Sequence, residues 1–275
     1  MMWMWVGSLF LACSSPPMSG DVNHARDGQR QRANPLNMPH DVVMNSASSS
    51  SVHEATSGHQ VEVPVMELLG HVDPRNHPDF SPIPAVYSSR EGLVLRTEAR
   101  DSLVAMADAA RKEGLQFIVL SATRTFDHQV AIWERKWKRP AYMGWGNLSK
   151  AQDILNYSAM PGSSRHHWGT DVDIFSLETH DFHSGEGAEL LAWMRSHAAR
   201  FGFEEVYDDN PLRTGYRPEP WHWSFMPLAG PFLNRLNEAL EDSSFQAFDG
   251  FAGSEYADSL EIVARYMHGL ASKTP

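Results

Sequence analysis

Two short segments, far apart in the chain, carry side chains of the kinds that bind metal ions, and the fold must bring them together if they form one site. The first is Ser164 to Asp173, SRHHWGTDVD, and the second is Glu219 to His222, EPWH. Together they supply three candidate ligands: His166, Asp173 and His222. Glu219 accompanies the last of these as a candidate base. Three protein ligands with one open coordination position are typical of catalytic zinc sites, so the chain has the parts of a zinc hydrolase.

Asp173 is expected on a strand that follows the loop carrying His166. The stretch Asp171 to Phe175, DVDIF, alternates polar and apolar residues, as a strand with one face in the core does. Side chains two positions apart share a face of a strand, so either Asp171 also borders the metal or the strand begins after it. The adjacent His167 is the alternative to His166 as ligand.

Glu219 and His222 are three positions apart, a spacing that would point them to opposite faces of a regular strand. Pro220, between them, breaks that regularity and permits both to converge. Glu219 would then take a proton from the activated water and pass it to the leaving amine, a step worth typically about 10²- to 10⁴-fold in rate. Trp221 and Trp223 are expected to face away from His222, into the core.

Composition narrows the classes of partner and of site. The formal net charge is -11, with 34 acidic against 23 basic residues, and no dense cluster of Lys and Arg follows the pattern of a phosphate-binding surface. Nucleic acid is therefore not an expected partner. Cys13 is the single cysteine, which excludes an intrachain disulfide and a cysteine-based zinc site. Any metal must be held by histidine and carboxylate.

The chain begins with an apolar run that ends at Cys13. The run MMWMWVGSLFLAC is too short to span a bilayer as a helix but suits the apolar part of a signal peptide. Phe10 to Cys13 resembles a bacterial lipobox, in which the cysteine is lipidated. No Lys or Arg precedes the run, so a cleaved secretory signal and a chance apolar start are the alternatives. We expect a signal peptide over 1–13 and a lipid-anchored protein of the bacterial cell envelope, in the periplasm or on the outer surface.

The rest of the chain divides into three expected parts. Residues 14–60 are rich in Ser, Pro, Asn, His and Gly without a sustained apolar period, which predicts a flexible linker. Residues 61–226 are the expected catalytic domain. Residues 227–275 are expected to form a C-terminal helical extension packed on that domain.

Hydrophobic periodicity within the catalytic domain predicts alternating helices and strands. The segment Pro140 to Tyr157 is expected to be an ordered loop over a cleft. Thr97 is expected to cap the first helix, which Gly114 ends. The order of elements favours a compact α+β domain. The further helices are predicted over 126–137 and 186–200, and the strands over 115–120, 171–175, 201–207 and 221–225.

Three motifs, in the right order, resemble those of the LAS-type zinc peptidases. Ser164, His166, Gly169 and Asp173 match the pattern S-x-H-x-x-G-x-A-x-D, and Glu219, Trp221 and His222 match E-x-W-H. Upstream, Ser121, Arg124 and Gln129 are similar to the S-x-x-R-x-x-x-x-Q segment of the same family. More narrowly, the chain resembles the VanY-like D-alanyl-D-alanine carboxypeptidases and dipeptidases of bacterial cell-wall metabolism and vancomycin resistance. The resemblance covers about Thr97 to Phe225.

The resemblance implies one α+β catalytic domain with a small antiparallel sheet and flanking helices, as in hedgehog and the D-Ala-D-Ala peptidases. It implies Zn²⁺ as cofactor. By position, the expected roles are zinc binding for His166, Asp173 and His222, catalytic base for Glu219, stabilisation of the oxyanion or of the substrate carbonyl for Arg124, and substrate binding for Ser164, Ser121 and Gln129, with Ser164 at the substrate's carboxylate.

The implied function is hydrolysis of peptidoglycan stem peptides by a zinc-dependent D-alanyl-D-alanine carboxypeptidase. A peptidoglycan endopeptidase, cutting L-Ala-D-Glu or D,D bonds, is the first alternative. A zinc-containing binding module without turnover is the second. Asp171 stands where the family usually has Ala, and facing the metal it would oppose a substrate carboxylate and favour the endopeptidase. The sequence does not indicate an oligomeric state.

Overall fold

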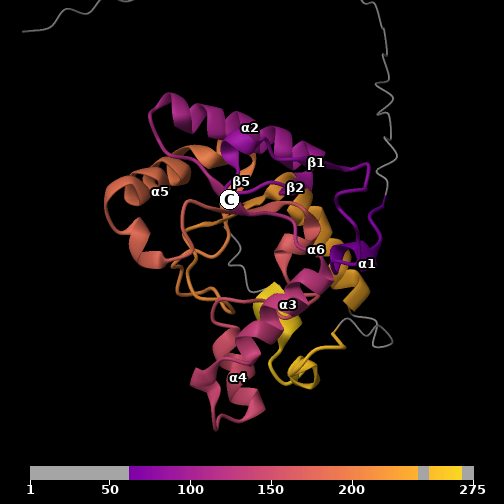
Figure 1. The fold of residues 1–275 in the computed structure, drawn as a ribbon. Coiled ribbons are helices and arrows are strands. Elements are labelled where there is room, and N and C mark those ends of the chain that lie inside the picture. Colours follow the sequence, from indigo (N-terminus) through magenta and orange to yellow (C-terminus); the bar gives the residue numbers. More distant parts are fainter. Residues whose placement is uncertain (1–61, 241–247, 268–275) are drawn as a thin grey trace, which may run out of the picture. The chain divides into compact units, whose positions relative to one another are not determined.

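The computed structural model describes residues 62–240 and 248–267, all within the unit His59–Pro275 (Figure 1). The predictions of a signal peptide over 1–13, of lipidation at Cys13 and of a linker over 14–60 fall outside the described residues. Within the two described ranges, no helix has the length and apolar character needed to cross a membrane.

The centre of the fold is a four-stranded antiparallel sheet in the order β3-β4-β6-β5. Strands β1 and β2 form a second, two-stranded antiparallel sheet. This architecture confirms the predicted α+β class with a small antiparallel sheet and flanking helices. The strands are β1 (Phe80–Pro82), β2 (Val94–Arg96), β3 (Val119–Ser121), β4 (Asp171–Ile174), β5 (Phe203–Glu205) and β6 (His222–Phe225).

The helices flank this sheet, and α2, α3 and α5 match the predicted helices within a few residues. The α-helices are α1 (Val65–Leu68), α2 (Thr97–Lys112), α3 (Phe126–Trp137), α4 (Asn147–Ile154), α5 (Gly185–His197) and α6 (Met226–Leu240). The 3-10 turns are η1 (Ala85–Tyr87), η2 (Pro140–Tyr142), η3 (Arg165–Trp168), η4 (Thr179–Phe182), η5 (Ala198–Phe201) and η6 (Ser254–Tyr256), and η7 (Ile262–Met267) is a π-helix.

Two predicted details are wrong. Thr97 is the first residue of α2 and not its cap, because its hydroxyl donates to the carbonyl of Asp79 outside the helix. The segment 140–157 is not a loop throughout, since α4 occupies its second half. Ala151 and Ile154, three positions apart on α4, bury their side chains in the cluster around Trp133, and this packing stabilises a helix that the Gly-rich and aromatic composition conceals.

The largest core lies between the sheet and helices α2 and α5. It receives the apolar face of α2, made by Leu103, Met106, Ala107 and Ala110, all fully buried. The sheet contributes alternate residues of β4 and β6 to it. In Figure 1, α2 lies on one side of the strands, whereas α3 and α4 lie on the other. One face of the sheet is thus committed to the core, and the other is free to carry polar side chains.

The C-terminal part of the chain packs against two further clusters. Phe251, Leu260 and Ile262 join Trp133 of α3. Helix α6 packs on Trp168 through Phe232 and Leu236, close to α1. Beyond residue 247 the described chain forms the short turn η6 and the π-helix η7 in place of regular α-helix. These contacts support the proposal that residues 227–275 extend the domain.

Candidate metal centre

The register between β4 and β6 places two of the predicted ligands directly opposite each other. Asp173 pairs with His222, and Asp171 pairs with Ser224 two positions away on the same face. The residue between them on β4, Val172, points into the main core. The alternation that the sequence shows in DVDI and HWSF therefore separates an apolar face from a polar one.

His166 reaches the same place from η3, the turn that precedes β4. Gly169 ends this turn with φ 74°, and a Cβ there would lie 2.4 Å from a ring carbon of Phe80, so glycine is required on both counts. The Nδ1 of His166 lies 2.8 Å from the carbonyl oxygen of Ala122. An N–H donated there leaves Nε2 unprotonated, 3.2 Å from Oδ1 of Asp173.

The three predicted ligands converge. One ligand atom from each of His166, Asp173 and His222 lies within 4.8 Å of the others, and all three side chains are buried. The Oδ1 of Asp173 is also 3.0 Å from Nδ1 of His222, while its Oδ2 accepts from Arg124 at 2.6 Å. Two imidazoles and a carboxylate at this spacing fit a tetrahedral metal ion with one position left open.

Charge interactions keep the ligands in defined states in the metal-free protein. Burial opposes ionisation of Asp173, but His166, His222 and Arg124 outweigh it and hold the pKa of Asp173 well below its usual range. Burial likewise opposes the charged form of His222, yet its hydrogen bonds with Asp171 and Asp173 raise its pKa to about 9. A bound metal would replace that proton on His222.

Glu219 lies beside this cluster without joining it. The amide of His222 donates to the carbonyl of Glu219 at 3.0 Å, which closes a turn over Pro220 and brings the two side chains together as predicted. Oε2 of Glu219 is 3.9 Å from Nδ1 of His222. Glu219 is 7% exposed, and burial raises the pKa of its carboxyl to about 7 against the opposing charge of His222.

The other predicted site residues divide into two groups. Arg124 and Ser164 line the cleft in front of the ligands. Ser121 and Gln129 do not line it. Ser121 accepts a hydrogen bond from Nε of Arg124 at 3.0 Å, and the amide of Gln129 donates to the carbonyl of Ala159 at 2.8 Å. Both thus support parts of the cleft wall from behind.

His167, the alternative ligand, is turned away from the cluster. Its Nδ1 lies 2.7 Å from the carbonyl oxygen of Arg124, and its Nε2 accepts from the amide of Gly162 at 3.1 Å. Burial lowers the pKa of His167 to about 3. With both ring nitrogens engaged by backbone, His167 ties two loops together, and the choice of His166 stands.

Asp171 does share a face with Asp173, but it does not border the cleft. Its carboxylate lies on the far side of His222, 2.8 Å from Nε2, and pairs with Arg165 at 2.9 Å. Burial opposes its ionisation, but Arg165 and His222 hold the pKa of Asp171 well below its usual range. The expectation that its charge opposes a substrate therefore fails, because Arg165 neutralises it.

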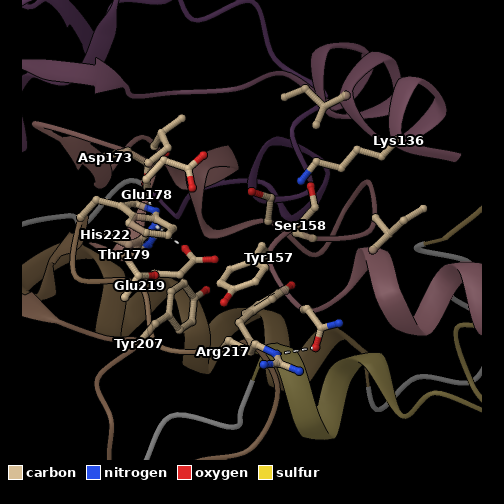
Figure 2. Close-up of a pocket in the computed structure, with 18 of the residues that line it drawn as sticks. Lys136, Tyr157, Ser158, Asp173, Glu178, Thr179, Tyr207, Arg217, Glu219 and His222 are labelled. Atoms are coloured by element: carbon tan, nitrogen blue, oxygen red, sulfur yellow. Dashed lines mark hydrogen bonds and ion pairs between the residues drawn. The ribbon is translucent and has the colours of Figure 1, made fainter. Parts of the chain in front are cut away.

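The cleft has a volume of about 870 Å³, and the motif residues that line it are joined by others that the motifs did not indicate. Figure 2 shows Lys136 reaching into it from the wall opposite Glu219 and His222, with Tyr157 between. Burial lowers the pKa of Lys136 to about 8, and Lys136 forms no ion pair with a described residue. In the sequence, Lys136 is one of several charged residues of α3, and no motif separates it from those that face solvent.

Tyr207 is the second residue that the motifs missed. Its ring packs on that of His222 with centroids 4.6 Å apart, and its side chain is buried at the cleft. Trp223 is in the core as predicted. Trp221 was expected there too, but it lines the cleft, and its ring centroid lies 6.4 Å from that of Tyr157. Trp221 precedes the first strand residue, so strand alternation does not apply to it.

Comparison with known proteins gives one consistent result. The family model D-alanyl-D-alanine carboxypeptidase, VanY, matches residues 92–228. A D-alanyl-D-alanine carboxypeptidase of Enterococcus faecalis is 31% identical over 154 residues, covering 54% of this chain and 56% of the relative. The protein YodJ of Bacillus subtilis is 32% identical over 136 residues, covering 48% of this chain and 46% of its own length. The chain thus spans about half the length of these curated relatives.

Solved structures with some likeness to the chain include VanYB in complex with D-alanine-D-alanine, with a TM-score of 0.44, 28% identity and coverage of 59% of this chain and 94% of that one. Another is a vancomycin resistance D,D-pentapeptidase VanY in complex with Zn(II), with a TM-score of 0.43, 28% identity and coverage of 64% and 93%. The matched residues 92–228 include His166, Asp173, Glu219 and His222. Through residues 92–228, the chain belongs to the VanY family of D-alanyl-D-alanine carboxypeptidases.

Proposed function

We propose that the protein is a zinc-dependent D-alanyl-D-alanine carboxypeptidase that hydrolyses the stem peptides of peptidoglycan. The observation that carries this proposal is the cluster of His166, Asp173 and His222 with Glu219 beside it, at the floor of a large cleft. Two histidines and one carboxylate are a donor set that suits zinc. The family to which residues 92–228 belong supports the reaction class.

When bound, zinc supplies Lewis-acid polarisation of the scissile carbonyl and lowers the pKa of the attacking water. Glu219 accepts the proton of that water. Its buried carboxyl, with a pKa raised towards neutrality, is matched to taking a proton and then giving it to the leaving amine. Arg124 lines the cleft and its Nη2 donates to Asp173, so its positive charge lies beside a metal ligand, which supports a role for Arg124 in stabilising an oxyanion.

The charges of the cleft favour a carboxypeptidase over an endopeptidase. A carboxypeptidase must bind the free carboxylate next to the bond it cleaves, and this calls for a cation facing the metal site. Lys136 offers an ammonium group there without an ion-pair partner among the described residues, and Ser164 offers a hydroxyl. The argument for an endopeptidase rested on an uncompensated charge at Asp171, which Arg165 removes.

The test is to incubate the zinc-loaded protein with muropeptides that carry a pentapeptide stem and to weigh the products. Loss of a single terminal alanine is the expected result. Products cleaved inside the stem or at a cross-link would replace the proposal by the endopeptidase. Full zinc occupancy with no cleavage of any of these substrates would replace it by the binding module.

We further propose that the protein acts in the bacterial cell envelope, attached through lipidated Cys13. The support is the lipobox-like sequence and the proposed substrate, the peptidoglycan of the cell envelope. In a cell fractionation, wild-type protein is expected with the membranes and Cys13→Ala in the soluble fraction. Recovery of Cys13→Ala with the membranes would refute lipid anchoring and leave the catalytic proposal untouched.

A further inference from the structure

Asp171 is fully buried, and its carboxylate is saturated with hydrogen bonds. Oδ1 accepts from the hydroxyls of Thr170 at 2.6 Å and Ser224 at 2.7 Å. Oδ2 accepts from Nε of Arg165 at 2.9 Å and lies 2.8 Å from Nε2 of His222. A carboxylate held by four donors cannot move without breaking several bonds at once, so Asp171 offers His222 a fixed acceptor.

We propose that Asp171 is a positioning residue that holds His222 in the tautomer and orientation needed to bind the metal ion through Nδ1. The inference rests on the proposed function, since it needs a metal at the cluster. With its Nε2 proton donated to Asp171, His222 keeps the lone pair of Nδ1 for the side where Asp173 lies at 3.0 Å. His166 is held in the corresponding way by the carbonyl of Ala122.

Arg165 is what allows a carboxylate at this position. Both side chains of the pair are buried, and an unpaired carboxylate there would be costly to bury. Arg165 also donates to the hydroxyl of Ser224 at 2.6 Å and lies over the ring of Trp168 at 4.4 Å. Because Ser224 in turn donates to Asp171, the three side chains form one closed network around the acceptor of His222.

A role in stability alone does not account for this network. Buried ion pairs contribute little net stability compared with apolar side chains of similar size, and Nη1 of Arg165 is buried without a hydrogen-bond partner among the described residues. With Ala at position 171, Nε2 of His222 would lose its anionic acceptor. A carboxylate behind a metal-binding histidine fixes the ring and strengthens it as a ligand, typically by about 10- to 100-fold in metal affinity.

The experiment measures zinc affinity by competition with a chelator of known affinity, at one fixed pH, together with thermal unfolding of each metal-free protein. Asp171→Ala is expected to weaken zinc binding by about 10- to 100-fold. Asp171→Asn keeps an acceptor oxygen for His222 and is expected to recover part of that loss. The double variant Arg165→Met/Asp171→Ala leaves no unpaired buried charge, so it is expected to fold as well as wild type while still binding zinc weakly.

The matched control is the pair Arg195 and Glu205, bonded at 2.7 Å, with Glu205 on strand β5 and outside the cleft. Arg195→Met/Glu205→Gln should leave zinc affinity unchanged. The proposal is overturned if the double variant at positions 165 and 171 binds zinc as tightly as wild type, or if Asp171→Asn binds no better than Asp171→Ala. Absence of zinc binding by the wild-type protein would instead refute the proposed function.

Discussion

Replacing Glu219 by Gln is expected to lower turnover and, at the same time, to stabilise the metal-free protein. Burial raises the pKa of Glu219 from the ordinary 4.5 to about 7. Above pH 7 the folded protein therefore carries this charge at a cost of ~3 kcal/mol relative to the unfolded chain. Gln has nearly the same shape and no charge, so at pH 8 Glu219→Gln should raise the free energy of unfolding by up to that amount.

The stabilisation expected from Glu219→Gln depends on pH. A carboxyl whose pKa is higher in the folded state contributes stability that is fully present below pH 4.5 and is lost as the pH rises through 7. At pH 4.5 or below, Glu219 is largely protonated in the folded protein and resembles Gln, so the two proteins should differ little in stability. The gain from Glu219→Gln should therefore appear between pH 4.5 and pH 7 and be complete at pH 8.

Turnover should respond in the opposite direction. Loss of a general base typically costs about 10²- to 10⁴-fold in rate. One equivalent of zinc should remain bound, because Glu219 is not one of the three clustered ligands and its Oε2 lies 3.9 Å from Nδ1 of His222. In the wild-type enzyme, kcat/KM should fall as the pH decreases below the pKa of Glu219, which the positive charge of bound metal moves to 7 or lower.

The assays are urea unfolding of the metal-free proteins at pH 4.5 and pH 8, and release of D-alanine from a pentapeptide by the zinc-loaded ones. Glu205→Gln is the control, since Glu205 is also buried but bonded to Arg195 at 2.7 Å and 2.8 Å, and its loss should destabilise the protein. The reasoning is refuted if Glu219→Gln is no more stable than wild type at pH 8, or if it turns over at the wild-type rate.

Three further predictions test neighbouring parts of the site. His166→Ala should abolish stoichiometric zinc binding. His167→Ala should still bind zinc but lose ~2 to 4 kcal/mol of stability, because a buried ring bonded at both nitrogens is removed. Equal loss of zinc from both variants would contradict the choice of His166 as ligand. Lys136→Met should lower kcat/KM about 10- to 100-fold for a substrate with a free carboxylate and have little effect on kcat/KM for an amidated substrate. The control is Lys138→Met, at an exposed lysine. Equal effects on both substrates would exclude the carboxylate contact. Chelation should abolish activity and lower Tm, and added zinc should restore both; activity that survives chelation would exclude a metal mechanism.

The sequence predicted most reliably what depends on strand alternation and motif spacing. The stretches DVDI and HWSF became β4 and β6, and the convergence of His166, Asp173 and His222 agrees with what the resemblance to the zinc peptidases implied. The turn over Pro220 likewise brought Glu219 to His222. The strands and the turn depend on neighbouring residues, and the ligands join two segments that a metal ion would have to bring together.

Features that depend on tertiary contacts were not predictable. Helix α4 was missed because its stability comes from packing on Trp133, which cannot be read from its own composition. Lys136 looks like any solvated charge on α3 until the cleft wall is in place. Asp171 was recognised as unusual, but its partner Arg165 lies in a turn whose side-chain direction no periodicity gives.

Asp171 also shows how a site on this sheet can change without a change in the core. Val172 and Trp223 pair across β4 and β6 on the apolar face, while Asp171 and Ser224 pair on the polar face. A slip of one residue between these strands would exchange the faces and bury the ligands among apolar side chains, so the core itself fixes the register of the metal centre. Substitutions on the polar face, by contrast, leave the core contacts intact. A buried carboxylate can therefore be added behind His222 wherever a cation such as Arg165 neutralises it, and the strength of the metal ligand becomes adjustable independently of the fold.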